Sequence, residues 1–192
     1  MKKKKSVKEG IAVFLAVLFF VCICSCASRA NERRLYIYLT GTARFVLLPP
    51  AAIEKPMDMA QFISASFMGQ NHSFQAWVRA DETGMDIAMF NEIGAAMGEL
   101  SYIDGAINFS SRVFPGSLRP EYIVADFQLC FYDTVPLRRA LEDSGLSLEV
   151  HGNIRRIYDG RDLIIEIERT HNKVRLVNHL RGYTYTLEGD FE

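Results

Sequence analysis

Beyond its N-terminal segment, this chain has no second cysteine with which a disulfide could form. Three of its four cysteines, Cys22, Cys24 and Cys26, stand near the N-terminus, and Cys130 is the only one that follows them. No intramolecular disulfide can therefore form after residue 26. Cys130 lies in the apolar stretch 127–131, so we expect a buried, unreactive thiol rather than a nucleophile.

The apolar run near the N-terminus is too short for a membrane-spanning helix. It extends from Ile11 to Ile23 and contains thirteen residues, whereas a spanning helix needs roughly 20. Lysines at positions 2–5 and 8 precede it. A short apolar run behind a basic head is typical of a secretory signal, so we expect residues 1–25 to be removed on export.

The end of this signal predicts how the exported chain is anchored. Ile23-Cys24-Ser25-Cys26 matches a lipobox, with an aliphatic residue three positions, and a small residue one position, before a cysteine. The thiol of Cys26 would carry diacylglycerol, and its acyl chains would hold the protein on a membrane. An uncleaved apolar anchor with incidental cysteines is the alternative. Ala27, in place of an aspartate, favours the periplasmic side of an outer membrane.

A surplus of positive charge is also absent. Five lysines and Glu9 precede Cys26, so 17 basic and 22 acidic residues remain, a net charge of −5. Such a chain cannot neutralise many phosphates, which argues against a nucleic acid as partner. The remaining 167 residues fit a tether at 26–34 and one domain at 35–192.

Familiar catalytic motifs are missing as well. The sequence has no glycine-rich phosphate loop, no His-Glu-x-x-His and no Gly-x-Ser-x-Gly. Glu166 and Glu168 share a predicted strand face. We interpret them as cross-strand partners of Arg155, Arg156 and Arg169 on a solvated surface rather than as an acid–base pair. We predict no catalytic residue, no metal site and no cofactor.

Short apolar segments separated by turn residues dominate the chain from residue 35 onward. Candidate strands lie at 35–39, 45–48, 59–68, 73–79, 85–92, 99–103, 106–110, 148–151, 154–158, 163–168, 174–178 and 183–187. Asp104-Gly105 and Asp159-Gly160 predict tight hairpins, because glycine tolerates the positive φ of such turns. Alternation predicts that Ile165 and Ile167 face opposite to Ile164. The connections are too short for crossover helices, so the sheet should be antiparallel.

Two helices are predicted to interrupt these strands. After Pro120, apolar residues recur at three- and four-residue spacing as far as Phe131, which indicates an amphipathic helix. A second helix begins at Pro136 and ends before Gly145. The many phenylalanine, tyrosine and methionine residues either fill an ordinary core or line a cavity that a curved sheet leaves unfilled.

Two segments resemble a known family. Residues 118–129, LRPEYIVADFQL, resemble the signature of a family of bacterial lipoproteins of unknown function, and residues 152–158, GNIRRIY, are similar to one of its strands. Such proteins are often encoded beside aryl-polyene or fatty-acid-synthase-like genes, and they are similar to the outer-membrane lipoprotein receptor LolB and the carrier LolA. The resemblance implies an α+β fold, in which a strongly curved antiparallel sheet forms an incomplete β-barrel with a helical insertion as its lid.

The resemblance also implies which residues form the site. Lid and cavity residues would be Tyr122, Ile123, Phe127, Phe131, Leu137 and Leu141. LolB inserts an apolar loop into the membrane, and the turn at Phe67 and Met68 is the candidate for that role here. An ordinary hairpin is the alternative for this turn.

The leading hypothesis is therefore a carrier or receptor. It would bind an acyl chain, a lipid or a lipid-modified molecule in an apolar cavity and deliver it to the membrane that holds Cys26, with a periplasmic LolA-like carrier as partner. A structural or assembly module that docks another envelope protein, without a cavity, is the alternative. An enzyme is the third class, and the sequence offers no cluster of residues for it.

Overall fold

Two antiparallel sheets and two helices form the part of the chain that the structure describes. The computed structural model describes residues 35–67, 69–116 and 118–191. The strands are β1 (Tyr36–Tyr38), β2 (Arg44–Val46), β3 (Met57–Phe67), β4 (Gln70–Ala80), β5 (Gly84–Phe90), β6 (Ala96–Ile103), β7 (Ala106–Ser111), β8 (Ser147–His151), β9 (Ile154–Asp159), β10 (Asp162–Arg169), β11 (Lys173–Asn178) and β12 (Tyr183–Glu188). The helices are α2 (Pro120–Phe131) and α3 (Thr134–Glu142), preceded by the short 3-10 turn Pro50–Ala52.

The large sheet consists of two meanders joined at one seam. Its strand order is β7-β6-β5-β4-β3-β12-β11-β10-β9-β8, and β1 pairs with β2 in a separate two-stranded sheet. The seam is the antiparallel pair β3–β12, in which Phe67 lies opposite Tyr183 and Phe62 opposite Glu188. The sheet is not closed, and β7 and β8 are its edges. The prediction of an antiparallel sheet with a helical insertion is confirmed.

The predicted tight hairpins depend on aspartate and glycine in left-handed conformations. Asp104 and Gly105 have φ values of 51° and 75°, and the flanking residues Ile103 and Ala106 pair directly. Two successive positive φ values are the pattern of a type I′ turn, whose twist matches that of the strands it joins. Gly160, with φ 61°, serves the second predicted Asp-Gly hairpin.

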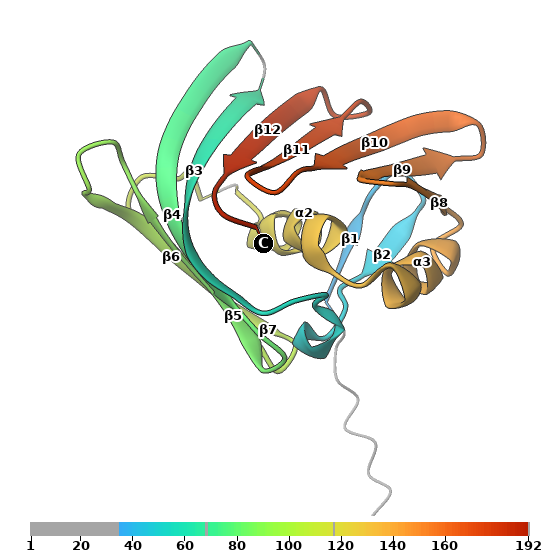
Figure 1. Ribbon diagram of the computed structural model, residues 1–192, viewed down its shortest axis with the longest axis horizontal. Coiled ribbons are helices and arrows are strands. Elements are labelled where there is room, and N and C mark those ends of the chain that lie inside the picture. Colours follow the sequence, from blue (N-terminus) through green and yellow to red (C-terminus); the bar gives the residue numbers. More distant parts are fainter. Residues whose placement is uncertain (1–34, 68, 117, 192) are drawn as a thin grey trace, which may run out of the picture. The chain divides into compact units, whose positions relative to one another are not determined.

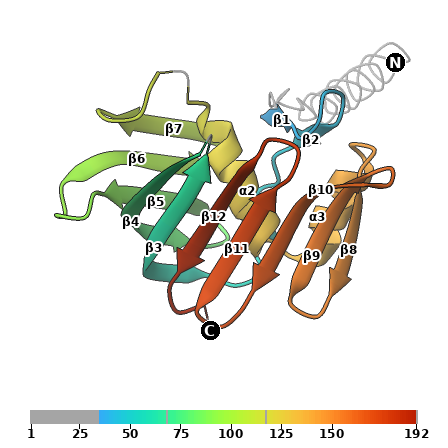
Figure 2. The same ribbon diagram turned by 90° about the horizontal axis from the view of Figure 1, so that it is seen from above.

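The helices cross from one edge of the sheet to the other. The chain leaves β7 at one edge and enters β8 at the opposite edge, and α2 lies in between, inside the bend of the sheet (Figures 1 and 2). The side chain of Asp133 accepts a hydrogen bond from Val135 N at 2.8 Å, so α3 begins slightly before the predicted Pro136. No helix among the described residues is long and apolar enough to cross a membrane.

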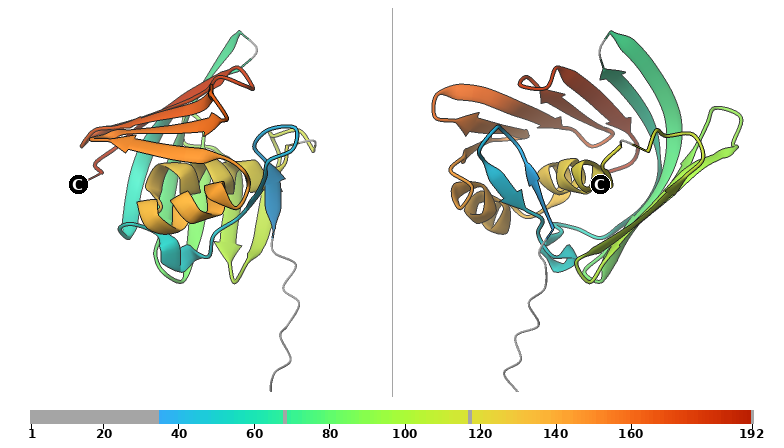
Figure 3. Two further views of the ribbon diagram at one scale, coloured as in Figure 1. Left: turned by 90° about the vertical axis from the view of Figure 1, so that its right-hand side faces the viewer. Right: turned by 180° about the vertical axis from the view of Figure 1, so that it is seen from behind.

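The core lies between the concave face of the sheet, α2 and the small β1–β2 sheet (Figure 3). Val124 and Leu129 of α2 and Phe45 of β2 are completely buried. The predicted opposite orientation of Ile164 and Ile165 is wrong, since both are buried. The pairing of β9 with β10 shifts register between Leu163 and Ile165, and such a bulge interrupts the simple alternation of faces.

Candidate functional site: an apolar pocket between the sheet and a helix

The concave face of the sheet and one face of α2 enclose an apolar pocket of about 190 Å³. Its sheet wall comes from β3, β4, β5 and β12, and its other wall comes from α2 and the segment before it. The lining residues are Gln61, Ile63, Ala65, Phe74, Val78, Ile87, Met89, Phe114, Leu118, Ile123, Asp126, Phe127, Cys130, Tyr185 and Leu187. A depression of about 420 Å³ on β5–β7 is lined in part by the exposed Asp86 and Glu99 and lacks such an apolar wall.

Local sequence patterns direct these side chains into the pocket. Along β3 every second residue faces inward, which places Ile63 and Ala65 on the same side. Ala65 lies opposite Tyr185 of β12, and its small side chain leaves room beside the larger one. On α2, Ile123 and Phe127 are four residues apart, and this spacing places both on one helix face.

Asp126 brings a carboxyl group to the wall of this pocket. It projects from α2 toward β12, where the hydroxyl of Tyr183 donates to its Oδ2 at 2.9 Å and the hydroxyl of Tyr185 donates to the same oxygen. Burial raises the pKa of Asp126 to about 6, although the hydrogen bonds from the two tyrosines and the nearby Arg181 act in the opposite direction. Asp126 therefore ties α2 to β12, and its carboxyl group loses its proton at a higher pH than an ordinary aspartate does.

The two tyrosines act as hydrogen-bond donors in this arrangement. Burial raises the pKa of Tyr183 and of Tyr185, and the adjacent carboxylate of Asp126 raises both further. The hydroxyl groups consequently keep their protons at any physiological pH. Their rings stack with centroids 5.4 Å apart, which fixes the positions from which they donate.

Cys130 is another titratable group in the pocket wall. It is 1 % exposed, so the prediction of a buried thiol is confirmed. Burial, together with the adjacent Asp126, raises the pKa of Cys130 to about 12. A thiol with this pKa has a negligible thiolate fraction at neutral pH and is a poor nucleophile.

The predicted cavity residues divide between the pocket and the core. Ile123 and Phe127 line the pocket. Phe131, one turn further along α2, packs against Phe127 with ring centroids 4.9 Å apart and does not line the pocket. Leu137 and Leu141 belong to α3, where both are completely buried in the core away from the pocket lining.

The remaining predicted residues lie elsewhere. The hydroxyl of Tyr122 faces β1 and donates to Tyr38 O at 3.4 Å. Phe67 is the last residue of β3 and pairs with Gln70 across the hairpin turn. Met68 and the predicted acylation site Cys26 lie outside the described residues.

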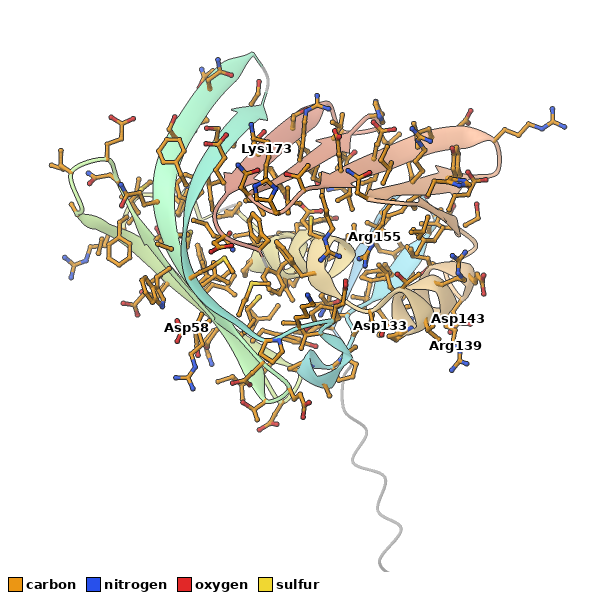
Figure 4. The ribbon with its side chains drawn as sticks, viewed as in Figure 1. Asp58, Asp133, Arg139, Asp143, Arg155 and Lys173 are labelled. Carbon is orange, nitrogen blue, oxygen red and sulfur yellow. The ribbon has the colours of Figure 1, made fainter. Side chains whose placement is uncertain are left out.

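A buried arginine holds the C-terminal end of α2 against the sheet. Arg155, on β9, donates through Nη1 to Leu129 O at 2.9 Å and Cys130 O at 3.4 Å, both in the last turn of the helix. Its Nη2 lies 3.2 Å from Oε2 of Glu54, which also receives Arg169 Nη1 at 2.6 Å. Figure 4 shows Arg155 between the strands and the helices. The positive charge lies where the carbonyls of α2 lack helical partners.

The prediction that Arg155 belongs to a solvated charge pair is wrong. Arg155 is 4 % exposed and alternates along β9 with the buried Ile157, so both side chains point into the core. The neighbouring Arg156 points the other way and binds Glu166 at 2.7 Å, as predicted. Because side chains alternate along a strand, Arg155 and Ile157 share a face, and this was the signal that could have identified the buried arginine.

The described site suits the binding of an apolar group. Its walls are apolar apart from Gln61, Asp126 and the hydroxyl of Tyr185. Within residues 35–67, 69–116 and 118–191, no three His, Cys, Asp or Glu side chains are grouped so that they could hold a metal ion. The polar groups offer hydrogen bonds and one ionisable carboxyl.

One comparison with known proteins identifies a related group. A family model described as "Protein of unknown function (DUF3261)" matches residues 58–189. The matched segment contains nearly all of the large sheet and both helices, and it therefore includes the whole pocket. No curated protein matches the chain.

Proposed function

Because the chain belongs to the DUF3261 family, a family of proteins of unknown function, we propose a function from the pocket itself. The protein is a lipid-anchored envelope lipoprotein that holds an acyl chain or a similar apolar group between α2 and the sheet, and it passes that group to the outer membrane. The observation that supports this proposal most directly is the apolar pocket of about 190 Å³ between these two elements.

The size of the pocket indicates a partial or expandable site. Pockets for complete small molecules usually measure about 300–1,000 Å³, so 190 Å³ accommodates part of an acyl chain. A longer chain requires α2 to move away from the sheet. In this proposal α2 is the lid of an incomplete, LolA/LolB-like barrel, and α3 follows it.

The energetics suit a carrier rather than a permanent store. Each methylene moved from water into the pocket contributes about 0.8 kcal/mol, so affinity increases with the enclosed length of chain. Lifting α2 breaks the hydrogen bonds that Asp126 makes at its middle and that Arg155 makes at its C-terminal end. This cost opposes the gain from burial and keeps binding reversible. No covalent step is needed for uptake or release.

Native mass spectrometry and a filled pocket together test the proposal. The protein purified from cells should carry a co-purifying lipid. Ala65→Phe places an aromatic ring in the pocket and should weaken the binding of a fluorescent fatty acid at least about tenfold, which corresponds to a loss of about 1.4 kcal/mol. Thermal unfolding shows whether the variant is folded.

The matched control is Ala60→Phe, the same change on the same strand. Ala60 is exposed and lies on the opposite face of β3 from Ala65, because the two positions differ by an odd number of residues. This variant should bind the probe like the wild type. Equal probe binding by both variants, or a purified protein that is always empty and takes up no probe, would contradict the proposal.

A docking module for another envelope protein is the second candidate, and two exposed aromatic side chains favour it. Phe62 and Trp77 are 39 % and 50 % exposed on the outer face of β3 and β4. Trp77 Nε1 donates to Asp58 Oδ1 at 2.7 Å, which orients the ring along the surface. A photo-crosslinking residue at position 77 that captures one protein in stoichiometric yield, from cells in which the pocket is empty, would favour this candidate over the carrier.

A further inference from the structure

Aromatic and basic side chains form a surface patch where β1, the start of α2 and the β11–β12 turn meet. Residues of this tyrosine–arginine patch come from separate parts of the chain, and none of them lines the pocket. The patch consists of Tyr36, Tyr38, Arg44, Arg119, Tyr122 and Arg181.

Direct contacts make the patch continuous. The rings of Tyr36 and Tyr38 meet edge to face with centroids 5.7 Å apart. The guanidinium of Arg44 lies 3.9 Å from the centre of the Tyr36 ring. Guanidinium groups favour the face of an aromatic ring, and this contact holds the charge beside the ring without neutralising it.

Arg181 extends the patch from β1 to α2. Its Nη2 donates to Tyr38 O at 2.5 Å and to the hydroxyl of Tyr122 at 3.0 Å, and its guanidinium carbon lies 4.2 Å from the centre of the Tyr122 ring. The guanidinium carbon of Arg119 lies 5.6 Å from the centre of the same ring. The chain thus brings three arginines and three tyrosines to one surface.

The patch differs from the rest of the chain in charge and exposure. Tyr36 and Tyr38 are 38 % and 43 % exposed, and Leu180, next to Arg181, is 54 % exposed. Glu121 lies 3.6 Å from Arg119, and the charge of Arg181 lowers the pKa of the buried Asp126. Three arginines at one place contrast with the net charge of −5 that follows the predicted cleavage site.

The chain enters the described structure beside this patch. Eight residues, 27–34, separate the predicted anchor Cys26 from Leu35, and they contain three arginines and one glutamate. An extended chain spans at most about 3.6 Å per residue, so an anchored Cys26 keeps β1 within about 30 Å of the bilayer. The predicted tether therefore brings a basic, tyrosine-rich surface close to lipid headgroups.

We propose that the tyrosine–arginine patch rests on the membrane surface and binds anionic lipid headgroups. Tyrosine rings favour the membrane–water interface, and arginine forms paired hydrogen bonds with phosphate oxygens. The exposed Leu180 adds an apolar side chain at the same level. The occupant is a lipid surface because the short basic tether and the complementary charge both favour it.

Binding of the patch to a membrane would also determine which end of the pocket faces that membrane. The β1–β2 sheet, the β11–β12 turn and the segment between β7 and α2 lie at the same end of the strands (Figure 2). Phe114 and Leu118 of that segment line the pocket. The patch would thus turn this end of the pocket toward the bilayer, a consequence that rests on the proposed carrier function, whereas headgroup binding does not.

Vesicle binding by a chain that begins at Ala27 tests the patch without the anchor. Such a chain keeps every described residue and hence the whole described core. It should co-sediment with vesicles of phosphatidylglycerol and phosphatidylethanolamine, release at high salt, and bind phosphatidylcholine vesicles far less. An arginine near an anionic surface contributes a factor of about five, so Arg44→Gln/Arg119→Gln/Arg181→Gln should reduce binding by about a hundredfold.

Matched charge removal elsewhere provides the control. Arg79, Arg161 and Arg175 are exposed and lie outside the patch, and their replacement by glutamine should change binding by less than about fivefold, the share of one arginine at the surface. If the triple patch variant does not fold, Arg44→Gln/Arg119→Gln keeps the hydrogen bonds of Arg181 and should reduce binding by about 25-fold.

Three results would overturn the proposal. They are the absence of wild-type binding to anionic vesicles, equal binding to neutral vesicles, and equal losses in the patch and control variants. The fatty-acid probe assay on the same proteins separates this outcome from failure of the carrier function. A chain that takes up the probe but ignores vesicles contradicts the patch alone, and the reverse result contradicts the pocket alone.

Discussion

Replacement of Asp126 by asparagine should change how stability depends on pH. The carboxyl of Asp126 has a pKa of about 6 in the folded protein, against an ordinary value of 3.8, chiefly because it is buried. Asparagine has nearly the same size and can still accept hydrogen bonds from Tyr183 and Tyr185, but it does not titrate. The variant therefore isolates the effect of the charge.

The direction follows from proton binding. Between pH 3.8 and about 6 the folded wild type holds the Asp126 proton and the unfolded chain does not, so the free energy of unfolding falls as pH rises. The stability that this bound proton contributes is complete below pH 3.8, the pKa of Asp126 in the unfolded chain, and is lost above about pH 6, its pKa in the folded protein. A difference of about two pKa units corresponds to about 3 kcal/mol. From about pH 3 to pH 7, Asp126→Asn should gain about 3 kcal/mol in stability relative to the wild type.

Urea unfolding followed by far-ultraviolet circular dichroism measures this difference. Both proteins, beginning at Ala27, are unfolded across this pH range, and the wild-type free energy is subtracted from that of the variant at each pH. All other titrating groups are shared and cancel in the subtraction. A difference that does not change with pH, or one that changes in favour of the wild type as pH rises, would refute the reasoning.

Three further predictions concern the anchor, the buried arginine and the ligand. Cys26→Ser should abolish fatty-acid labelling and leave an uncleaved precursor, because a hydroxyl is a far weaker nucleophile than a thiol, whereas Cys24→Ser should be silent; label that persists in Cys26→Ser would show that the anchor is another residue. Arg155→Gln should lower the free energy of unfolding by about 3–5 kcal/mol. Arg156→Gln removes a partly exposed pair and should lower it far less; equal losses in urea unfolding would contradict the described role of Arg155. A bound acyl chain further desolvates Asp126 and so favours its protonated form. The affinity for a fatty alcohol in the probe assay should therefore rise several-fold from pH 7.5 to pH 5 in the wild type and stay constant in Asp126→Asn. Parallel pH profiles of the two proteins would exclude this linkage.

The strands could be predicted because local chemistry determines them. Alternating side chains indicate their length, and turns such as Asp104-Gly105 indicate where they end. The seam between β3 and β12 could not be predicted, because Glu188 lies 126 residues after its partner Phe62. Many strands of similar composition could have paired there, and the choice depends on how α2 packs against the whole sheet.

The candidate site was predictable on its helical side. The spacing of Ile123 and Phe127 placed both on one helix face, since residues four apart are neighbours there, and the family resemblance implied that this face borders a cavity. Asp126 lies between them, and a carboxyl group within an otherwise apolar helix face indicates a buried polar contact. Its partners Tyr183 and Tyr185 come from the last strand, nearly 60 residues later. Only the docking of α2 against that strand brings them together.

The seam between β3 and β12 also determines how the protein can be assembled. Each meander of the large sheet contains neighbours in sequence and can form by local pairing, but β12 is the last strand of the chain and its partner β3 is the first strand of that sheet. Because pairing over such a separation is slow, the two halves should form first and join last. A chain shortened before Tyr183 leaves β3 and β11 with open edges, and open edges recruit strands from other molecules. Proteolytic loss of the C-terminus should therefore produce aggregates rather than a smaller functional domain.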